Sequence, residues 1–209
     1  MMNRWPVALI ALLLQGGLSS ASLSHDSNMT KTSPLAYSNP QQSRAAPTPV
    51  TVTLALDDHS LTVHFKVTCA KIFAREQLAH GEYPYEYDVV ELFVANANLV
   101  DHGYYEFEVS PYNQSLQVNV VKPREEYYFG VKNGFSHEAR IVQGGWEADM
   151  SIPLAALGWE ESQPLQLVGN AYAALGDNDH RVYWSLFELS AGKPDFHAPS
   201  AFRPLFDAK

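Results

Sequence analysis

Alternation of apolar and polar residues constrains this chain most, because it recurs along much of the sequence with a period of two. Over 61–68 (LTVHFKVT), apolar side chains occupy every second position. The same alternation appears over 104–109 and 146–152. Successive side chains of a β-strand point to opposite faces, so each of these segments predicts a strand with one buried face.

Further segments of the same kind indicate more strands. They are 51–56, 88–95, 115–121, 136–142, 165–174 and 181–187, with turn-forming residues between them. Helical pattern is scarce: Pro153 and Gly158 bracket one short turn, and 72–80 could form another. About nine strands with one or two short helical turns predict an all-β domain. We expect an antiparallel two-sheet β-sandwich of the jelly-roll or immunoglobulin-like kind.

The N-terminal region predicts export. Arg4 precedes an apolar run over 7–14, and small residues follow up to Ala21, so 1–21 is expected to be a signal peptide cleaved near Ala21. The apolar run is shorter than the ~20 residues of a membrane span. We therefore expect a periplasmic or extracellular protein without a membrane span. Residues 22–49 are rich in Ser, Pro, Asn and Gln and predict a flexible linker, which leaves 50–209 as the folded domain.

Charge and motif content exclude several classes of function. The formal net charge is −9, and lysine and arginine are not clustered, so a nucleic-acid or anionic-membrane partner is not expected. The single cysteine rules out an intramolecular disulfide. The chain has no Gly-x-Ser-x-Gly elbow, no phosphate-binding glycine loop and no Cys–His metal spacing.

The segment 85–94 (YEYDVVELFV) combines aromatic rings and carboxylates at the start of an apolar strand. Aromatic rings pack on the C–H faces of sugars, and carboxylates accept hydrogen bonds from hydroxyls. Apolar residues occupy both faces of this strand, so Glu91 is expected to be partly buried, where an unpaired charge is costly. Either Arg140 or Arg181 could pair with it, or ligand hydroxyls could do so.

The order of several motifs resembles a known family. The motifs are YEYDVVELFV at 85–94, YYEFEV at 104–109, GWEADMSIP at 145–153, GN at 169–170, YWS at 183–185 and FHAPSAF at 196–202. Together they resemble the family 9 carbohydrate-binding modules and the wider DOMON-like β-sandwich group over about 50–207. The resemblance implies a secreted sandwich that binds sugars in carbohydrate catabolism without cleaving them. It requires no cofactor and could act beside a separate carbohydrate-active enzyme.

The resemblance also implies a binding site. Sugar-binding members clamp a pyranose between two tryptophans; Tyr85 falls on the first position and Trp184 on the second, with Glu91 as the matching acid. Glu108 stands where those members carry an arginine, which reverses the charge of that contact. Trp184 has the strand parity of a core residue, so Tyr183 is an alternative stacking residue. The expected ligand-binding residues are Tyr85, Asp88, Glu91, Glu108, Arg181, Tyr183 and Trp184.

Three other interpretations stay open at this stage. Some sandwiches of the wider group bind haem b through Met with His or Lys; the candidates here are Met150, His197 and His102. A glycoside hydrolase could use two carboxylates from Glu91, Glu106 and Glu108. An envelope protein without a small ligand is the third.

Structural calcium is a separate expectation, because members of the family can hold this ion in acidic loops. The candidate ligands are Asp57 and Asp58 in one turn, and Asp177 and Asp179 in another.

Overall fold

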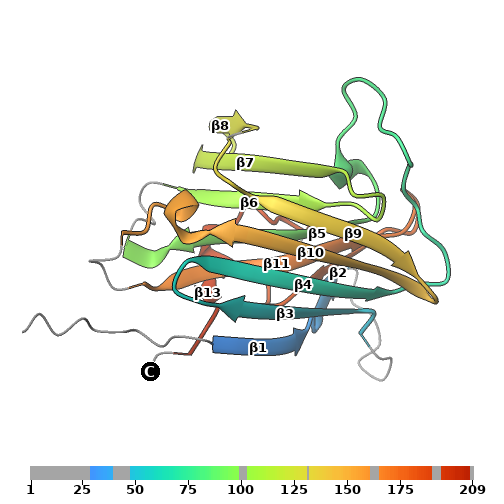
Figure 1. Ribbon diagram of the computed structural model, residues 1–209. Coiled ribbons are helices and arrows are strands. Elements are labelled where there is room, and N and C mark those ends of the chain that lie inside the picture. Colours follow the sequence, from blue (N-terminus) through green and yellow to red (C-terminus); the bar gives the residue numbers. More distant parts are fainter. Residues whose placement is uncertain are drawn as a thin grey trace, which may run out of the picture.

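The computed structural model describes residues 29–39, 48–98, 103–130, 132–160, 165–189 and 194–207 of the 209-residue chain. They form two antiparallel β-sheets packed face to face, with helical structure limited to short 3₁₀ turns in this described part (Figure 1). The predicted all-β sandwich is therefore confirmed. None of these helical turns is long and apolar enough to cross a membrane.

The first sheet has five strands in the order β1-β3-β4-β10-β9. Their bounds are Met29–Pro34 for β1, Val50–Leu56 for β3, Ser60–Thr68 for β4, Gly145–Pro153 for β10 and Ser136–Val142 for β9. Burial alternates along β3, β4 and β10 as the period of two predicts. One face of this sheet therefore packs in the core, and the polar residues lie on its other face.

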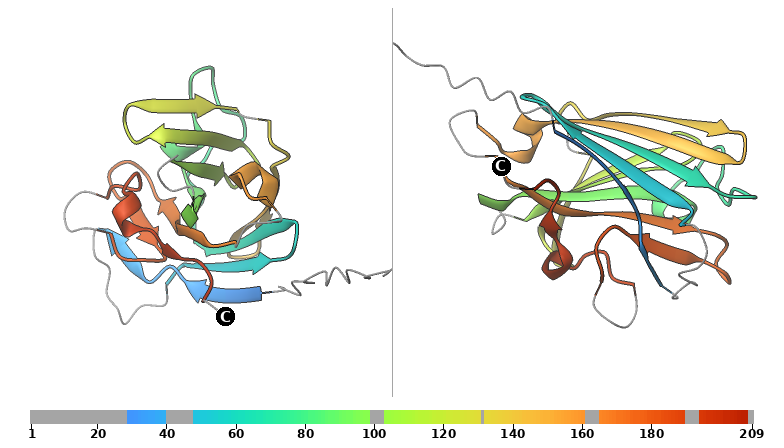
Figure 2. Two further views of the ribbon diagram at one scale, coloured as in Figure 1. Left: turned by 90° about the vertical axis from the view of Figure 1, so that its left-hand side faces the viewer. Right: turned by 90° about the horizontal axis from the view of Figure 1, so that it is seen from below.

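The second sheet has eight strands, seven of them in the order β2-β12-β11-β5-β6-β7-β8, with β13 pairing β11. Their bounds are Tyr37–Asn39 for β2, Val182–Ser185 for β12, Leu167–Leu175 for β11, Val89–Asn96 for β5, Tyr104–Val109 for β6, Ser115–Lys122 for β7, Glu126–Phe129 for β8 and Arg203–Pro204 for β13. All residues of β5 are buried, as expected for a central strand with both faces covered. The two layers are separate when seen from below (Figure 2, right).

Two apolar clusters explain why both faces of the eight-stranded sheet are covered. The larger lies between the sheets and contains Phe65, Leu92 and Trp146, each 0% exposed. The smaller lies on the outer face of the eight-stranded sheet, where Phe93 and Tyr172 pack with Phe196 and Phe202 from the C-terminal segment. This outer face carries the candidate site.

All nine predicted strands are present, and four further strands, β1, β2, β8 and β13, were not predicted. The predicted linker 22–49 is wrong for residues 29–39, which form β1 and β2. Leu35 between them is 0% exposed, and its N–H donates to the carbonyl of Val50 at 3.0 Å. After Met29, β1 contains no apolar residue except its last proline, so backbone hydrogen bonds to β3 hold it without any hydrophobic pattern.

The predicted helical turns have different outcomes. A turn forms at η3 (Leu154–Leu157), and Gly158 ends it in the left-handed region at φ 72°. The expected turn over 72–80 does not form. Two further turns, η1 (Pro84–Glu86) and η4 (Pro199–Ala201), occupy loops at the outer face of the eight-stranded sheet.

Candidate ligand-binding site

The outer face of β5 and β6 holds a cavity of about 380 Å³. Its floor comes from Glu91 and Phe93 on β5 and from Glu106 and Glu108 on β6. The β7–β8 hairpin lines one part of the wall, and residues 194–197 line another. The aromatic residues of the wall are Tyr85, Tyr127, Phe129, Tyr183, Phe196 and His197.

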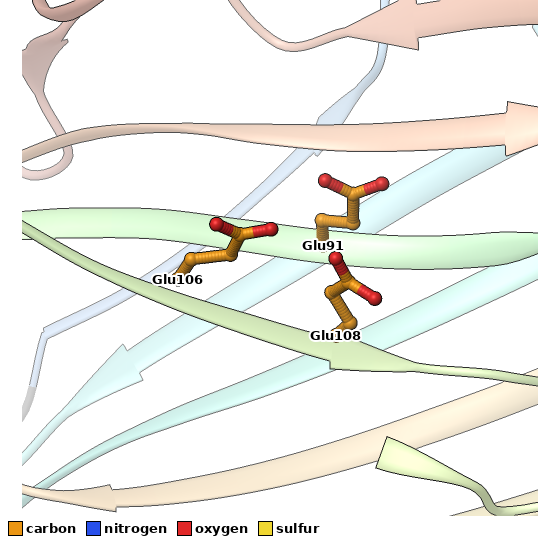
Figure 3. A group of neighbouring side chains, drawn as sticks. All are labelled: Glu91, Glu106 and Glu108. Carbon is orange, nitrogen blue, oxygen red and sulfur yellow. The ribbon is translucent and has the colours of Figure 1, made fainter. Parts of the chain in front are cut away.

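Three glutamates converge on the floor (Figure 3). Glu91 and Glu108 are opposite each other in the β5–β6 ladder, and Glu106 lies two residues from Glu108 on the same face. One carboxylate oxygen from each lies within 4.8 Å of the others. The three residues are only 0–5% exposed. Like charges at directly opposite positions of a sheet destabilise it, so this arrangement is unusual for a purely structural ladder.

Burial dominates the electrostatics of these acids. Burial raises the pKa of Glu108 well above its ordinary value, and the neighbouring Glu91 raises it further. Burial also raises the pKa of Glu91, with Glu106 adding to the rise and Arg181 opposing it. Neither carboxylate oxygen of Glu108 receives a hydrogen bond of regular geometry from the described residues. The backbone N–H of Tyr85 is close enough to oppose the rise in the pKa of Glu108, but this contact is weaker than burial and the neighbouring acids. The floor therefore favours bound protons or a bound positive or hydrogen-donating group.

Arg181 stabilises the backbone next to the cavity. One of its terminal nitrogens donates to the backbone carbonyl of Tyr85 at 2.7 Å and to that of Tyr87. It therefore anchors the η1 turn that carries Tyr85. The other predicted partner of Glu91, Arg140, instead pairs with two acids of β10 on the five-stranded sheet.

Exposed aromatic rings lie beside the acidic floor. Tyr85 is 45% exposed and stacks on Tyr83, with ring centroids 5.3 Å apart and planes 9° apart. Tyr83 lies 6.4 Å from Phe129, which is 59% exposed. Tyr183 is partly exposed, with the guanidinium of Arg181 5.6 Å from its ring centroid. These contacts hold the rings in place before any ligand arrives.

The cavity brings together four of the seven predicted ligand residues: Tyr85, Glu91, Glu108 and Tyr183. Trp184 is 9% exposed and packs in the cluster between the sheets, so it does not line the cavity. This follows from strand parity, because neighbouring residues of β12 point to opposite faces. The structure thus places Tyr183, rather than Trp184, beside the cavity.

Asp88 lies outside the cavity and joins two loops. It is 1% exposed, and its carboxylate accepts the backbone N–H of Phe73 at 2.8 Å and of Gly176 at 2.7 Å. Burial nevertheless raises the pKa of Asp88, with these two hydrogen bonds opposing the rise. Its geometry is that of a loop anchor beside the site.

The cavity also contains residues outside the predicted set of sugar contacts. Glu106 shares a face with Glu108, so strand parity alone could have found it. Phe129 and Phe196 reach the cavity from segments distant in sequence; Phe196 belongs to a motif of the resemblance, whereas Phe129 carries no local signal. His197 is fixed by a 2.7 Å hydrogen bond between its Nδ1 and the hydroxyl of Tyr104, and its Nε2 lies 3.9 Å from Glu106 Oε2.

The haem candidates are not brought together. Met150 is 2% exposed in the core between the sheets, whereas His197 contacts Phe93 and Tyr104 on the outer face of the eight-stranded sheet. That sheet separates the two side chains. His102 lies outside the described residues.

In the two predicted calcium loops, Asp57 and Asp177 accept hydrogen bonds from the backbone of their own turns. Asp57 accepts the backbone N–H groups of His59 and Ser60 at 2.8 and 2.7 Å. Asp177 accepts the backbone N–H groups of Asp179 and His180 at 3.2 and 3.0 Å. In the described ranges, neither these two acids nor Asp58 or Asp179 belongs to a group of three acidic, His or Cys residues close enough to share an ion.

The chain is similar in sequence to two curated proteins over part of their length, and it is similar in fold to three solved structures. No protein-family model matches the chain. The "UPF0462 protein C4orf33 homolog" of Mus musculus is 32% identical over 128 residues, which are 57% of this chain and 61% of that protein. The Rattus norvegicus homologue is 32% identical over 132 residues, 57% of this chain and 59% of that protein. The match therefore spans about three fifths of the length of these curated relatives.

Three solved structures are similar to the chain. A protein of Bacteroides uniformis ATCC 8492, provisionally described as carbohydrate-binding, has a TM-score of 0.61 at 21% identity, covering 73% of this chain and 75% of that one. A family 9 module of Caldicellulosiruptor kristjanssonii in complex with glucose has a TM-score of 0.56 at 16% identity, covering 84% and 82%. A module of that family and organism with cellotriose has a TM-score of 0.50 at 16% identity, covering 70% of each chain. At these identities the likeness concerns the fold, and this chain has a β-sandwich like that of the family 9 carbohydrate-binding modules.

Proposed function

We propose that this protein binds a carbohydrate in the cavity over β5 and β6 without cleaving it. The observation that carries the proposal is the placement of exposed aromatic rings beside buried carboxylates in one cavity of about 380 Å³. Small-molecule sites commonly measure ~300–1,000 Å³. Carboxylates accept hydrogen bonds from sugar hydroxyls, and ring faces pack on sugar C–H groups.

In this proposal, Tyr85 and Tyr183 supply the stacking faces, and Glu91 and Glu108 accept hydroxyl hydrogen bonds. Arg181 contributes by fixing the backbone of Tyr85 and by packing on Tyr183. The glucose and cellotriose complexes of modules with a similar fold support a sugar as the ligand.

The wider role belongs to the same proposal. The signal-peptide pattern over 1–21 supports export to the periplasm or the extracellular space. There the protein would take part in carbohydrate catabolism, alone or beside a separate carbohydrate-active enzyme.

A glycan array followed by calorimetric titration of the best ligand tests the proposal. We expect Tyr85→Ala and Tyr183→Ala each to weaken binding about 10- to 30-fold, because each ring would cover roughly 60–80 Å² of sugar at about 25 cal/mol per Å². Tyr128→Ala is the matched control: Tyr128 is 52% exposed on β8 but does not line the cavity. A wild-type protein that binds no glycan, or equal losses in all three variants, would contradict the proposal.

Glycoside hydrolysis is a second candidate, favoured by the closeness of Glu91, Glu106 and Glu108. Retaining glycosidases hold an acid and a nucleophile ~5–5.5 Å apart, but the nucleophile must be ionised. Burial raises the pKa of Glu91 and that of Glu108, which opposes ionisation of both. Release of reducing sugar that Glu108→Gln or Glu91→Gln abolishes would replace the binding proposal with this one.

A further inference from the structure

Three buried acids are more than a neutral sugar needs, and their geometry suits an ion. We propose that Glu91, Glu106 and Glu108 bind a hard divalent cation, best Ca²⁺, at the floor of the cavity (Figure 3). Such a site is distinct from the Asp57 and Asp177 turns, whose carboxylates already accept backbone N–H groups.

The spacing of the three oxygens allows one shared ion. Calcium binds carboxylate oxygens at about 2.3–2.6 Å. Two ligands on opposite sides of the ion are then about 4.8 Å apart, and ligands at smaller angles are closer. One oxygen from each of the three glutamates lies within 4.8 Å of the others, so all three can reach a common centre without moving their strands.

Glu108 gives independent evidence that a charged partner belongs in this place. It is 0% exposed, it lines the cavity, and neither of its oxygens receives a hydrogen bond of regular geometry in the described part of the chain. Its one donor nearby is the backbone N–H of Tyr85, which carries no charge. A buried acid without a charged partner is costly, and such groups are normally paired or coordinate a metal. Two free oxygens on one carboxylate also permit bidentate binding, a common mode for calcium.

The described residues offer little competing positive charge inside the cavity. Its described lining contains no lysine or arginine. Arg181 lies beside the cavity, where it interacts electrostatically with Glu91 and donates to two backbone carbonyls, but it does not line the cavity. His197 has its Nδ1 on Tyr104 and its Nε2 3.9 Å from Glu106, beyond hydrogen-bond distance.

The donor set selects the kind of ion. Carboxylate oxygens suit Ca²⁺, Mg²⁺ and Mn²⁺, whereas zinc and copper favour nitrogen and sulfur ligands. Magnesium demands near-ideal octahedral geometry at ~2.0–2.1 Å and keeps several waters, while calcium accepts six to eight oxygens in flexible arrangements. Side chains spaced by a rigid β-ladder therefore fit calcium better.

The ion would also contribute to ligand recognition, a second step that rests on the proposed function. Three glutamates leave coordination positions open on the cavity side, which water or a pair of sugar hydroxyls can fill. The acid at position 108 would then act through the bound cation as well as by accepting hydroxyl hydrogen bonds. Sugar affinity should accordingly fall when the ion is removed.

Calorimetric titration of the EDTA-treated and dialysed full chain with CaCl₂ and with MgCl₂ at pH 7.5 tests the site without any sugar. We expect one Ca²⁺ per chain, weaker binding of Mg²⁺, and a higher unfolding temperature with Ca²⁺. Losing a metal ligand's supporting partner already costs about 10- to 100-fold in affinity. Glu108→Gln and Glu91→Gln remove ligands themselves, so each should weaken Ca²⁺ binding more than 100-fold.

Glu76→Gln is the matched control, because Glu76 is exposed and lies outside the cavity. Urea unfolding in EDTA verifies that each variant is folded. Absence of Ca²⁺ binding to the wild type, or equal binding by Glu108→Gln, overturns the site. Binding of methylammonium or glucosamine without Ca²⁺ binding also overturns it, in favour of an organic cation.

Sugar titrations with Ca²⁺ and with EDTA separate this inference from the proposed function. Ca²⁺ binding in a protein that binds no glycan supports the ion site and contradicts the proposed function. Sugar affinity that is equal in Ca²⁺ and EDTA supports the proposed function and contradicts the role of the ion in recognition.

Discussion

Replacing Glu108 by glutamine should stabilise the metal-free protein at alkaline pH. Most buried-residue substitutions destabilise a fold, so the expected sign is opposite to the usual one. Glutamine has nearly the same shape but carries no charge, and its amide can donate to the carboxylate of Glu91 in the opposite ladder position.

The expected gain follows from the spacing of the acids. One oxygen of Glu91 lies within 4.8 Å of one oxygen of Glu108, and two unit charges at that limit repel by about 3.5 kcal/mol at an effective dielectric constant of about 20. Burying an imperfectly paired amide costs about 1 kcal/mol of this. We therefore expect Glu108→Gln to raise the free energy of unfolding by about 2–3 kcal/mol at pH 8 in EDTA.

The size of the expected gain in stability depends on pH. The folded-state pKa values of Glu91 and Glu108 lie above the ordinary value of 4.5, so the folded protein holds protons that the unfolded chain has released. Stability from each group is complete below pH 4.5 and is lost as pH rises through the raised pKa, at up to about 1.4 kcal/mol per pH unit. The variant has one such group fewer, so its stability falls less steeply, and the two proteins converge near pH 4.5.

Urea unfolding from pH 5 to pH 8 in EDTA measures this difference, with fluorescence of the four tryptophans as the probe. Glu76→Gln controls for a change of net charge and should follow the wild type. A variant that is less stable than the wild type by the same amount at pH 5 and pH 8 would refute the reasoning. It would mean that Glu108 has stabilising partners in the folded state.

Three further substitutions test the assigned roles by urea unfolding. Trp184→Ala should lower the free energy of unfolding by about 3–5 kcal/mol, because a core ring is lost. Asp88→Asn should lower it by about 1–3 kcal/mol, since the amide can accept only one of the two backbone N–H groups well. Gly169→Ala should lower it by at least about 2 kcal/mol, because the new Cβ would lie 2.1 Å from the carbonyl oxygen of Phe93 and push β11 from β5.

Strand positions could be predicted wherever burial is one-sided. The segment 136–142 became β9 with the same bounds, and 51–56 became β3 with one added residue. β1 could not be found in this way, because its side chains are almost all polar. Backbone hydrogen bonds to β3 hold this edge strand, and such bonds do not depend on which side chains the strand carries.

The candidate site could be predicted only in part, for a similar reason. Its floor lies on adjacent strands with a period of two, which predicted the partial burial of Glu91; the resemblance added Glu108 as a ligand contact. Its wall comes from segments that meet only in the folded chain, such as Phe129 on β8 and Phe196 near the C-terminus. Strand parity predicts that Trp184 is a core residue, and its ring is indeed buried between the sheets.

A contrast between two buried acids argues that the floor exists for a ligand. Asp88, directly before β5, and Glu108, on β6, are both almost fully buried. Asp88 receives two backbone N–H groups in good geometry, as a structural carboxylate does. In the described chain, Glu108 receives no hydrogen bond of regular geometry and has only the backbone N–H of Tyr85 nearby. A fold that needed only a filled position opposite Glu91 would be more stable with an uncharged residue there, by the few kcal/mol predicted above. The protein keeps an acid that costs stability when empty, which is reasonable where the partner of that acid comes from outside the chain.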